Sequence, residues 1–376
     1  MLDSGHKFRP VEIECTAKML ACGTTIGGGI HYCCENKDCS HTKVIKTSCK
    51  CKLCHSCGQK ATERWMAIQG EVLPDCQWRH ITFTMPDIFW DVFKLNRKLL
   101  GKLFTIACDS LQTLGKLKKL TIGIFSALHT YGRQLNFNCH IHLSLADIGL
   151  TEQGELRPFR FSFKSLQKKW RYGVISLLRH HFSELTLPEK LIENVTDKES
   201  WNKVLDKEYK KTWQVNIAKK TSHKAHTKRY LGSYIKKPPI AGAQLKHYVD
   251  ESVEIEYLDH NTKTISGKKL TQFELIERIL SHVPEKFFKM IRYYGFLSNR
   301  LRSRLLPIIY EKLEQTVKPV TAPSYAAMLK GYVNVDPYQC ILCGGRMVFH
   351  RFKSGAPLHK LVDGVQKLAK LKRVEV

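Results

Sequence analysis

The order of apolar and polar residues predicts an antiparallel sheet in the middle of the chain. The stretch WRHITFTMP, residues 78–86, alternates between apolar and polar positions, as a strand with one buried face does. Two further strand-like stretches, IGIFSALHT and CHIHLSLAD, occupy residues 122–130 and 139–147 on either side of a short polar turn. Such an arrangement is typical of a hairpin, so we expect these two strands to pair.

Apolar residues spaced three and four apart predict helices on both sides of this sheet. Helices are expected over residues 87–114, over 163–181, from about 201 to 236, and over 273–283. The stretches VEIEYLD and KTISGKKLT, residues 253–259 and 263–271, predict a second hairpin. The mixture predicts an α+β fold, in which a palm-like antiparallel sheet is flanked by helices.

The composition and apolar periodicity of the chain predict three consecutive regions. Residues 1–74 are rich in Gly and Cys and have little apolar periodicity, so they cannot bury much core without a metal or a cross-link. Residues 75–307 contain the predicted sheet and helices, and residues 308–376 form a basic region with a small Cys pair. We therefore expect a metal-binding module, a main domain and a basic C-terminal region.

The charge of the chain points to a polyanionic partner. The 61 Lys and Arg residues exceed the 34 Asp and Glu residues by 27, and the excess is spread along the whole chain. Nucleic acid is the expected partner, because neutralisation of phosphates supplies most non-specific affinity for it. No apolar run approaches the roughly 18 to 20 residues of a membrane span, and no secretory leader is evident. We expect a cytoplasmic protein associated with the prokaryotic nucleoid and not with a membrane.

Nine of the fourteen cysteines lie between residues 15 and 57, at spacings that zinc sites use. Cys54 and Cys57 form a C-x-x-C pair, and Cys34 and Cys39 are separated by four residues, so the two pairs are expected to make one tetrahedral site. A second zinc is a further possibility, with candidate ligands Cys22, His31, Cys33, Cys49 and Cys51. The pair Cys340 and Cys343 is half of a zinc knuckle, which His350 or His359 could extend.

His140 and His142 share one face of their predicted strand, while Ile141 and Leu143 occupy the other. His129 lies eleven positions before His140, and an antiparallel hairpin brings it opposite one of the pair. Three imidazoles leave coordination positions open for water or a phosphate oxygen, as a catalytic divalent ion requires. His80 is an alternative third ligand, and a merely solvated strand face is the plainer interpretation.

Tyr230 and Tyr234 lie four residues apart on a predicted helix, hence one turn apart on the same face. Basic residues flank the pair and are expected to contact DNA: Arg229, Lys236 and Lys237. An apolar stripe on that face, which includes Leu231 and Ile235, favours a core-facing helix when the helix is considered alone.

In combination, these features resemble the rolling-circle insertion-sequence transposases of the HUH class with two tyrosines, relatives of the Helitron transposases. The resemblance extends over about residues 20–300 in order. It rests on SCKCKLCHSCGQ, WRHITFTMP, LHTYGRQLNFNCHIHLSL, YLGSYIKKPPIA and FELIERILSHVPEKFFKMIRYYGFLSNR.

The resemblance implies roles for particular residues. The histidine pair of the family falls on His140 and His142, and its two nucleophilic tyrosines fall on Tyr230 and Tyr234. The three histidines, with His129, are also similar to those of conjugative relaxases. The zinc-binding cysteines of the family fall on Cys34, Cys39, Cys49, Cys54 and Cys57. The first 74 residues would then recognise DNA, and residues 75–307 would form an HUH-type nuclease.

The resemblance implies a transposase that nicks and rejoins single-stranded DNA through a 5′-phosphotyrosine. The histidines would bind Mg²⁺ or Mn²⁺. The enzyme would move an insertion sequence by a rolling-circle route. No G-x-x-x-x-G-K-[ST] sequence is present, in keeping with rejoining that needs no ATP. A rolling-circle replication initiator or relaxase is the runner-up. A zinc-dependent DNA-binding regulator without catalysis is the alternative from another class.

Overall fold

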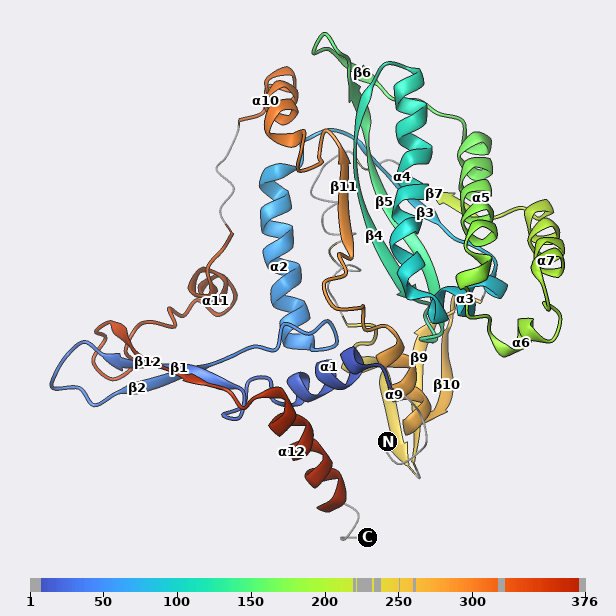
Figure 1. Ribbon diagram of the computed structural model, residues 1–376. Helices are drawn as coiled ribbons and strands as arrows, with labels where there is room; N and C mark the ends of the chain where they lie inside the picture. The colour runs from blue at the N-terminus through green and yellow to red at the C-terminus, as the bar shows by residue number, and fades with distance from the viewer. Residues whose placement is uncertain are drawn as a thin grey trace. The chain divides into compact units, whose positions relative to one another are not determined.

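The computed structural model describes residues 8–218, 238–249, 251–259, 262–316 and 322–371, together with Thr221 and Gly232 (Figure 1). Its contacts divide the chain into two compact units. The terminal unit contains residues 1–68 and 321–376, and the central unit contains 69–235 and 239–320. The three consecutive regions expected at 1–74, 75–307 and 308–376 are thus grouped differently, because a strand near the C-terminus pairs with one near the N-terminus.

The sheet of the central unit has the strand order β11-β4-β5-β3-β7, with antiparallel neighbours throughout. The strands are β3 (Trp78–Phe83), β4 (Thr121–Tyr131), β5 (Phe137–Leu150), β7 (Val215–Ile217) and β11 (Ile291–Gly295), and β6 (Leu156–Pro158) pairs with the end of β5. The predicted α+β fold with an antiparallel sheet and flanking helices is confirmed.

One face of this sheet is covered by helices (Figure 1). Ile141, Leu143 and Leu145 of β5 pack in the same buried cluster as Leu103 and Phe104. The helical segments are η1 (Asp87–Phe89), α3 (Trp90–Leu95), η2 (Arg97–Leu99), α4 (Leu100–Leu117), α5 (Phe163–His180), η3 (Phe182–Glu184), α6 (Glu189–Ile192) and α7 (Lys198–Lys210). The odd-numbered positions of β5 therefore supply core, which leaves the histidines on the other face.

The helix predicted over residues 87–114 is interrupted at Asn96. Its backbone has φ −110° and ψ 59°, and its side-chain amide donates to the carbonyls of Val92 and Thr186 at 2.8 and 2.7 Å. Asparagine side chains compete with the helical backbone for such partners, so the segment folds as α3 and α4 with a corner between them.

The helix expected from about 201 to 236 is confirmed over residues 201–210 and is wrong over residues 211–218. Helix α7 ends at Lys210, and Val215–Ile217 instead forms β7, which pairs with β3. The Trp213 side chain is buried, and its indole N–H donates to the carbonyl of Glu208 at 3.0 Å. Burial of Trp213 against the core thus overrides the helical spacing of the sequence.

A second, smaller sheet in the central unit has the order β10-β9-β8. Its elements are η4 (Gly242–Gln244), β8 (Leu245–Val249), β9 (Ser252–Leu258), β10 (Ile265–Thr271) and the following helix α9 (Gln272–Ser281). The hairpin and helix predicted here are confirmed. Val253, Ile255 and Leu275 form their own buried cluster with Leu135 from the β4–β5 turn. Helix α10 (Arg302–Lys312) completes the unit.

The terminal unit is built from both ends of the chain. Its elements are α1 (Pro10–Leu20), β1 (Gly28–Cys34), β2 (Thr42–Lys46), the start of α2 (His55–Val72), α11 (Tyr325–Val333), β12 (Met347–Ser354) and α12 (Leu358–Leu371). The three strands make an antiparallel sheet in the order β12-β1-β2. Among the described residues of the whole chain, no helix is both long and apolar enough to cross a bilayer.

Candidate active site and metal centres

Three histidines meet on the face of the central sheet opposite α4 and α5, and the His129 and His142 side chains are buried there. His129 of β4 is paired directly opposite His140 of β5, as the hairpin predicted, and His142 follows two positions later. One ring nitrogen from each histidine lies within 4.8 Å of those of the other two, and the Nε2 atoms of His140 and His142 are 3.0 Å apart. We call these three residues the histidine cluster. The three histidines converge because β4 and β5 are paired neighbours and because alternate residues of a strand point to the same face.

The protonation of the cluster suits a metal ion. Burial lowers the pKa of His140 to about 4, although a hydrogen bond to the carbonyl of Asn138 opposes the shift. Burial also lowers the pKa of His142, and repulsion from His140, His129 and His80 adds to the effect. His140 Nδ1 lies 2.8 Å from the Asn138 oxygen, so it donates there and leaves the Nε2 lone pair available. Both rings are neutral near pH 7, which is the form that binds metals.

His80, the alternative third ligand, lies behind the cluster instead of within it. Its Nε2 is 3.0 Å from Nδ1 of His142, and the two rings stack with centroids 5.2 Å apart. Burial lowers the pKa of His80 to about 4. The hydroxyl of Thr82 is 3.3 Å from the same His142 nitrogen. His142 is therefore held from behind while its Nε2 faces the other two histidines.

Tyr131 also lies beside the histidine cluster, although it is not among the site residues expected from the sequence. Its ring centroid lies 4.4 Å from that of His129. The signal was available, because Tyr131 follows His129 by two positions on β4 and so points to the same side of the strand.

The expected tyrosine pair and its basic neighbours fall outside the described residues: Tyr230, Tyr234, Arg229, Lys236 and Lys237. Thr221 marks the nearest described point on the N-terminal side. Its backbone exchanges hydrogen bonds of 3.0 and 3.1 Å with Trp78, the first residue of β3. The chain thus approaches this segment along the strand that carries His80.

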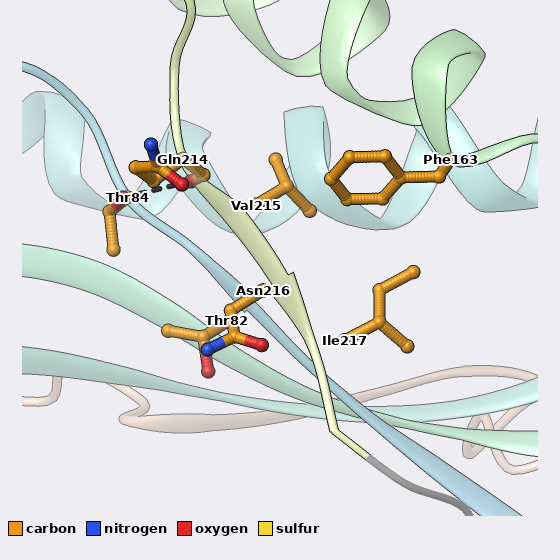
Figure 2. A pocket seen from close by; sticks show the side chains of 7 residues that line it. All are labelled: Thr82, Thr84, Phe163, Gln214, Val215, Asn216 and Ile217. Carbon is orange, nitrogen blue, oxygen red and sulfur yellow. Dashed lines mark hydrogen bonds between the residues drawn. The ribbon is translucent and has the colours of Figure 1, made fainter.

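A groove of about 800 Å³ runs along the edge of the sheet beside β7. It is lined by Thr82, Thr84, Phe163, Gln214, Val215, Asn216 and Ile217. Figure 2 shows the Phe163 ring with Val215 and Ile217 on one side of β7, and Gln214 and Asn216 on the other. Thr82 lines this sheet groove, and its hydroxyl also lies 3.3 Å from Nδ1 of His142.

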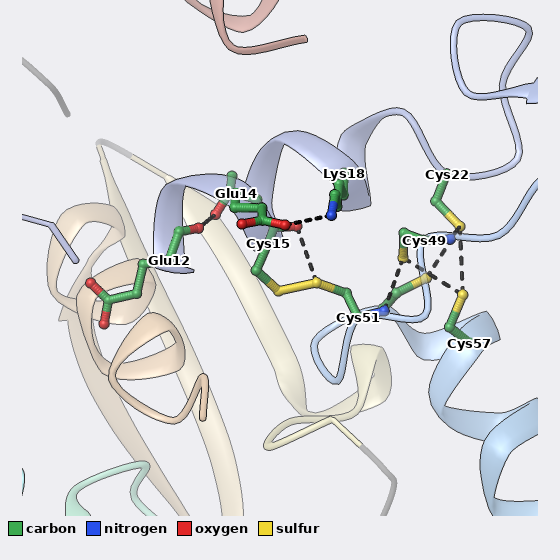
Figure 3. Close-up of a disulfide and its surroundings, with 10 residues drawn as sticks. Glu12, Glu14, Cys15, Lys18, Cys22, Cys49, Cys51 and Cys57 are labelled. Carbon is green, nitrogen blue, oxygen red and sulfur yellow. Dashed lines mark hydrogen bonds and ion pairs between the residues drawn. A yellow bond between two sulfur atoms is a disulfide. The ribbon is translucent and has the colours of Figure 1, made fainter. Parts of the chain in front are cut away.

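Four cysteines of the terminal unit form a first sulfur cluster, here called the loop cluster: Cys22, Cys49, Cys54 and Cys57. Sulfur pairs within it are 3.6 to 3.8 Å apart (Figure 3). Four sulfurs at the usual Zn–S distance of about 2.3 Å in a tetrahedron are about 3.8 Å from one another. The backbone N–H groups of Cys49 and Cys51 point at cluster sulfurs at 3.4 Å, as is common around bound metals.

A second group of four sulfurs, the end-joining cluster, contains Cys34, Cys39, Cys340 and Cys343. The single site expected from Cys34, Cys39, Cys54 and Cys57 is therefore not formed, because each pair completes its tetrahedron with other cysteines. Cys34 lies at the end of β1 whereas Cys54 and Cys57 lie at the start of α2. Sequence spacing identified the pairs but could not tell which pairs meet.

Three other candidate ligands of a second zinc lie outside both sulfur clusters: His31, Cys33 and Cys51. His31 lies within β1, opposite Val44 and Arg351, and is part of neither sulfur cluster. Cys51 forms a disulfide with Cys15 of α1, beside the loop cluster (Figure 3). Cys22 and Cys49 do join the loop cluster.

Comparisons with known proteins agree with this arrangement. A family model described as a transposase zinc-binding domain matches residues 1–85, and one described as a putative transposase matches residues 123–304. The zinc-binding match covers the whole loop cluster, and the transposase match covers the whole histidine cluster. The chain is thus a transposase with a zinc-binding domain.

The family follows from the relatives. The chain is 41% identical over 378 residues, its whole length and 92% of the relative, to the transposase for insertion sequence element IS801 of Pseudomonas savastanoi pv. phaseolicola. It is 26% identical to "putative transposase y4qJ" of Sinorhizobium fredii, over 84% of this chain and 81% of that one. The chain belongs to the IS91 family of insertion-sequence transposases. No solved structure matches it.

Proposed function

We propose that this transposase nicks and rejoins single-stranded DNA through a 5′-phosphotyrosine and moves its insertion sequence by a rolling-circle route. The observation that carries the proposal is the histidine cluster, in which three imidazoles converge on one face of the sheet and two of them, His140 and His142, are neutral near pH 7. Three nitrogen donors bind a divalent ion and leave positions for phosphate oxygens and water.

The donor set fits a divalent metal at this site, with His129, His140 and His142 as ligands. Mg²⁺ prefers oxygen ligands and binds imidazole weakly, so Mn²⁺ is expected to occupy the cluster at lower concentration. When bound, such an ion would polarise the scissile phosphate and offset charge that develops on it. The protein's own contribution is to keep the His140 and His142 imidazoles neutral and fixed, with Asn138 orienting His140 and His80 orienting His142.

Tyr230 and Tyr234 are the proposed nucleophiles. The phenolic oxygen of one tyrosine bonds to phosphorus, the bond from phosphorus to the 3′ oxygen breaks, and that oxygen leaves as a 3′-hydroxyl after it takes up a proton. The phenolic proton passes to solvent or to a base. Attack by a 3′-hydroxyl on the phosphotyrosine reverses the sequence, so the strand is rejoined without ATP. With two tyrosines, one can hold the transposon end while the other cuts a second strand.

The sheet groove is the proposed path of the single strand beside the scissile phosphate. Phe163 is 43% exposed and offers a ring on which a base can stack, while the Gln214 and Asn216 amides can bond to base edges. Because Thr82 contacts His142 and lines the groove, a strand in the groove would lead directly to the cluster. The excess of 27 positive charges would add affinity for phosphates, and so would place the protein on the nucleoid in the cytoplasm.

Covalent capture of an oligonucleotide tests the proposal. The full chain is incubated with Mn²⁺ and a single-stranded oligonucleotide that carries the end of the element, and the adduct is digested and mapped. We expect DNA on the peptide that contains YLGSY, and no adduct from Tyr230→Phe, Tyr234→Phe protein, which loses two hydroxyls and little else.

Tyr131→Phe is the matched control, because Tyr131 is the described tyrosine beside His129, and it should still form the adduct. An adduct on Tyr131, or one that survives in the double variant, would contradict the assignment of the nucleophiles. Absence of any adduct from the unmodified protein would favour the non-catalytic regulator. Excision of a marked element in cells separates a transposase from a replication initiator.

A further inference from the structure

We propose that the end-joining cluster binds a structural zinc ion that ties the two ends of the chain into one folded unit. The N-terminal half of the set comes from the β1–β2 hairpin and the other half from the segment that precedes β12. Cys340 and Cys343 lie far beyond residue 85, where the match to the zinc-binding domain ends. This inference is independent of the nuclease chemistry.

The sulfur geometry is that of a tetrahedral thiolate site. The Cys34 and Cys343 sulfurs are 3.4 Å apart, the Cys39 and Cys340 sulfurs are 3.7 Å apart, and all four lie within 4.8 Å. These separations are close to the edges of about 3.8 Å of a zinc–sulfur tetrahedron and far longer than the disulfide bond of about 2.05 Å. The cluster is therefore shaped to surround an ion.

The backbone turn after Cys340 also has the geometry of a zinc-binding turn. Gly344 has φ +73°, its N–H donates to the carbonyl of Cys340 at 3.0 Å, and the Cys340 N–H donates to Gly345 at 2.7 Å. A side chain at Gly345 would begin 3.3 Å from the Cys343 sulfur and 3.5 Å from the Cys34 sulfur. Two successive glycines thus let the backbone turn tightly around the sulfurs, as in a zinc knuckle.

A histidine outside the four cysteines contacts Cys340. The His41 Nδ1 atom lies 3.1 Å from the Cys340 sulfur. A hydrogen bond from outside the ligand set is typical of metal sites, where it orients the ligand and stabilises its charge.

The apolar core around the end-joining cluster is small. The buried apolar cluster here consists of Cys34, Cys340 and Met347, with Tyr32 and Cys39 packed against it. The other links here are the backbone pairing of β1 with β12, ring contacts of Tyr32 with Tyr338 and Phe349, and polar contacts such as the 2.9 Å bond from the Arg346 N–H to Glu35. A core of this size does not offset the entropy of ordering the segment, and small modules of this kind depend on metals.

Zinc stoichiometry tests the proposal. His140→Ala, His142→Ala protein is used as the background, so that zinc at the histidine cluster does not enter the count. We expect two zinc ions per chain in that protein, and one after Cys340→Ser, Cys343→Ser is added. Cys76→Ser is the matched control, since Cys76 lies in the central unit outside both sulfur clusters, and it should retain two. Two ions in the Cys340, Cys343 variant would overturn the proposal.

Thiol labelling of the unmodified chain gives an answer even if the serine variant does not fold. Cys343 is exposed, so as a free thiol it would react rapidly with an alkylating reagent. As a zinc ligand it should be protected, and should react together with Cys340 only after a chelator is added. Rapid labelling of Cys343 without chelator would overturn the proposal, as would a disulfide between Cys34 and Cys343 in freshly reduced protein.

Discussion

His142 has a different neighbour at each ring nitrogen. Its Nε2 faces His140, and its Nδ1 faces His80. The backbone of β5 presents it on the same side as His140, and core residues on the other side fix the strand. A substitution at this position therefore removes a proposed ligand without opening the apolar core.

Replacement of His142 by alanine should abolish cleavage and leave DNA binding nearly intact. The rate of adduct formation is expected to fall at least about 100-fold, as when a group that stabilises transition-state charge is removed. Binding to DNA depends on dispersed Lys and Arg and should change little. Gel-based cleavage and fluorescence anisotropy measure the two effects. Ser144→Ala, on the same strand face, is the control, and normal cleavage by His142→Ala would place the metal elsewhere.

His80 should act as a positioning residue. His80→Phe keeps an aromatic ring beside His142 but removes the nitrogen that lies 3.0 Å from it. We expect Mn²⁺ affinity to fall about 10- to 100-fold, with cleavage at saturating Mn²⁺ changed much less. His80→Gln, whose amide can occupy the place of Nε2, should restore most of the affinity. Equal Mn²⁺ titration curves for the Phe variant and the unmodified protein would show that His80 only fills space.

Among the elements, those with a local signal were predicted from the sequence. The β4–β5 hairpin, α5 and α9 each combine a clear period with a polar turn or a capping residue such as Ser162 or Thr271. The short strand β7 and the break at Asn96 were missed, because burial of Trp213 and the bonds of the Asn96 side chain to Val92 and Thr186 decide them. These contacts join residues that local patterns do not relate.

The candidate active site was also predictable only where the signal is local in the sequence. Alternation along β5 and the length of the turn identified the histidine cluster, since paired strands place residues in register. The sheet groove was not predictable, because it depends on β7 lying beside β3 and on the start of α5. The sequence also did not show which cysteine pairs come together, since the ligands of one zinc ion can be distant in sequence.

The first residue of α5 should contribute to single-strand binding through the sheet groove. Phe163→Ala removes a ring on which a base can stack, and such stacking contributes about 1 to 3 kcal/mol per base, so affinity should fall about 5- to 150-fold. Binding of duplex DNA should not change. Tyr172→Ala is the control on the same helix, because Tyr172 is exposed but does not line the groove. Equal losses in both variants, or no loss in either, would argue against the groove as the strand path.

At the scale of the whole molecule, the two units differ in what holds them together. The central unit has a large apolar core in which Trp78, Trp170, Trp201 and Trp213 are fully buried. The terminal unit instead contains two four-sulfur clusters and a three-stranded sheet whose middle strand, β1, comes from the N-terminal segment. Removal of zinc is therefore expected to affect the terminal unit first.

The end-joining cluster also bears on the order of events during translation. Cys39 and Cys340 are 301 residues apart, so the hairpin that leaves the ribosome early lacks half of its ligands while nearly all of the remaining chain is synthesised. At about 5 to 20 residues per second, that interval is on the order of 15 to 60 seconds. A chain truncated by a premature stop codon before Cys340 would never complete the unit. The end-joining cluster thus makes the N-terminal module of this transposase dependent on full-length synthesis. Incomplete products would lack a finished terminal unit.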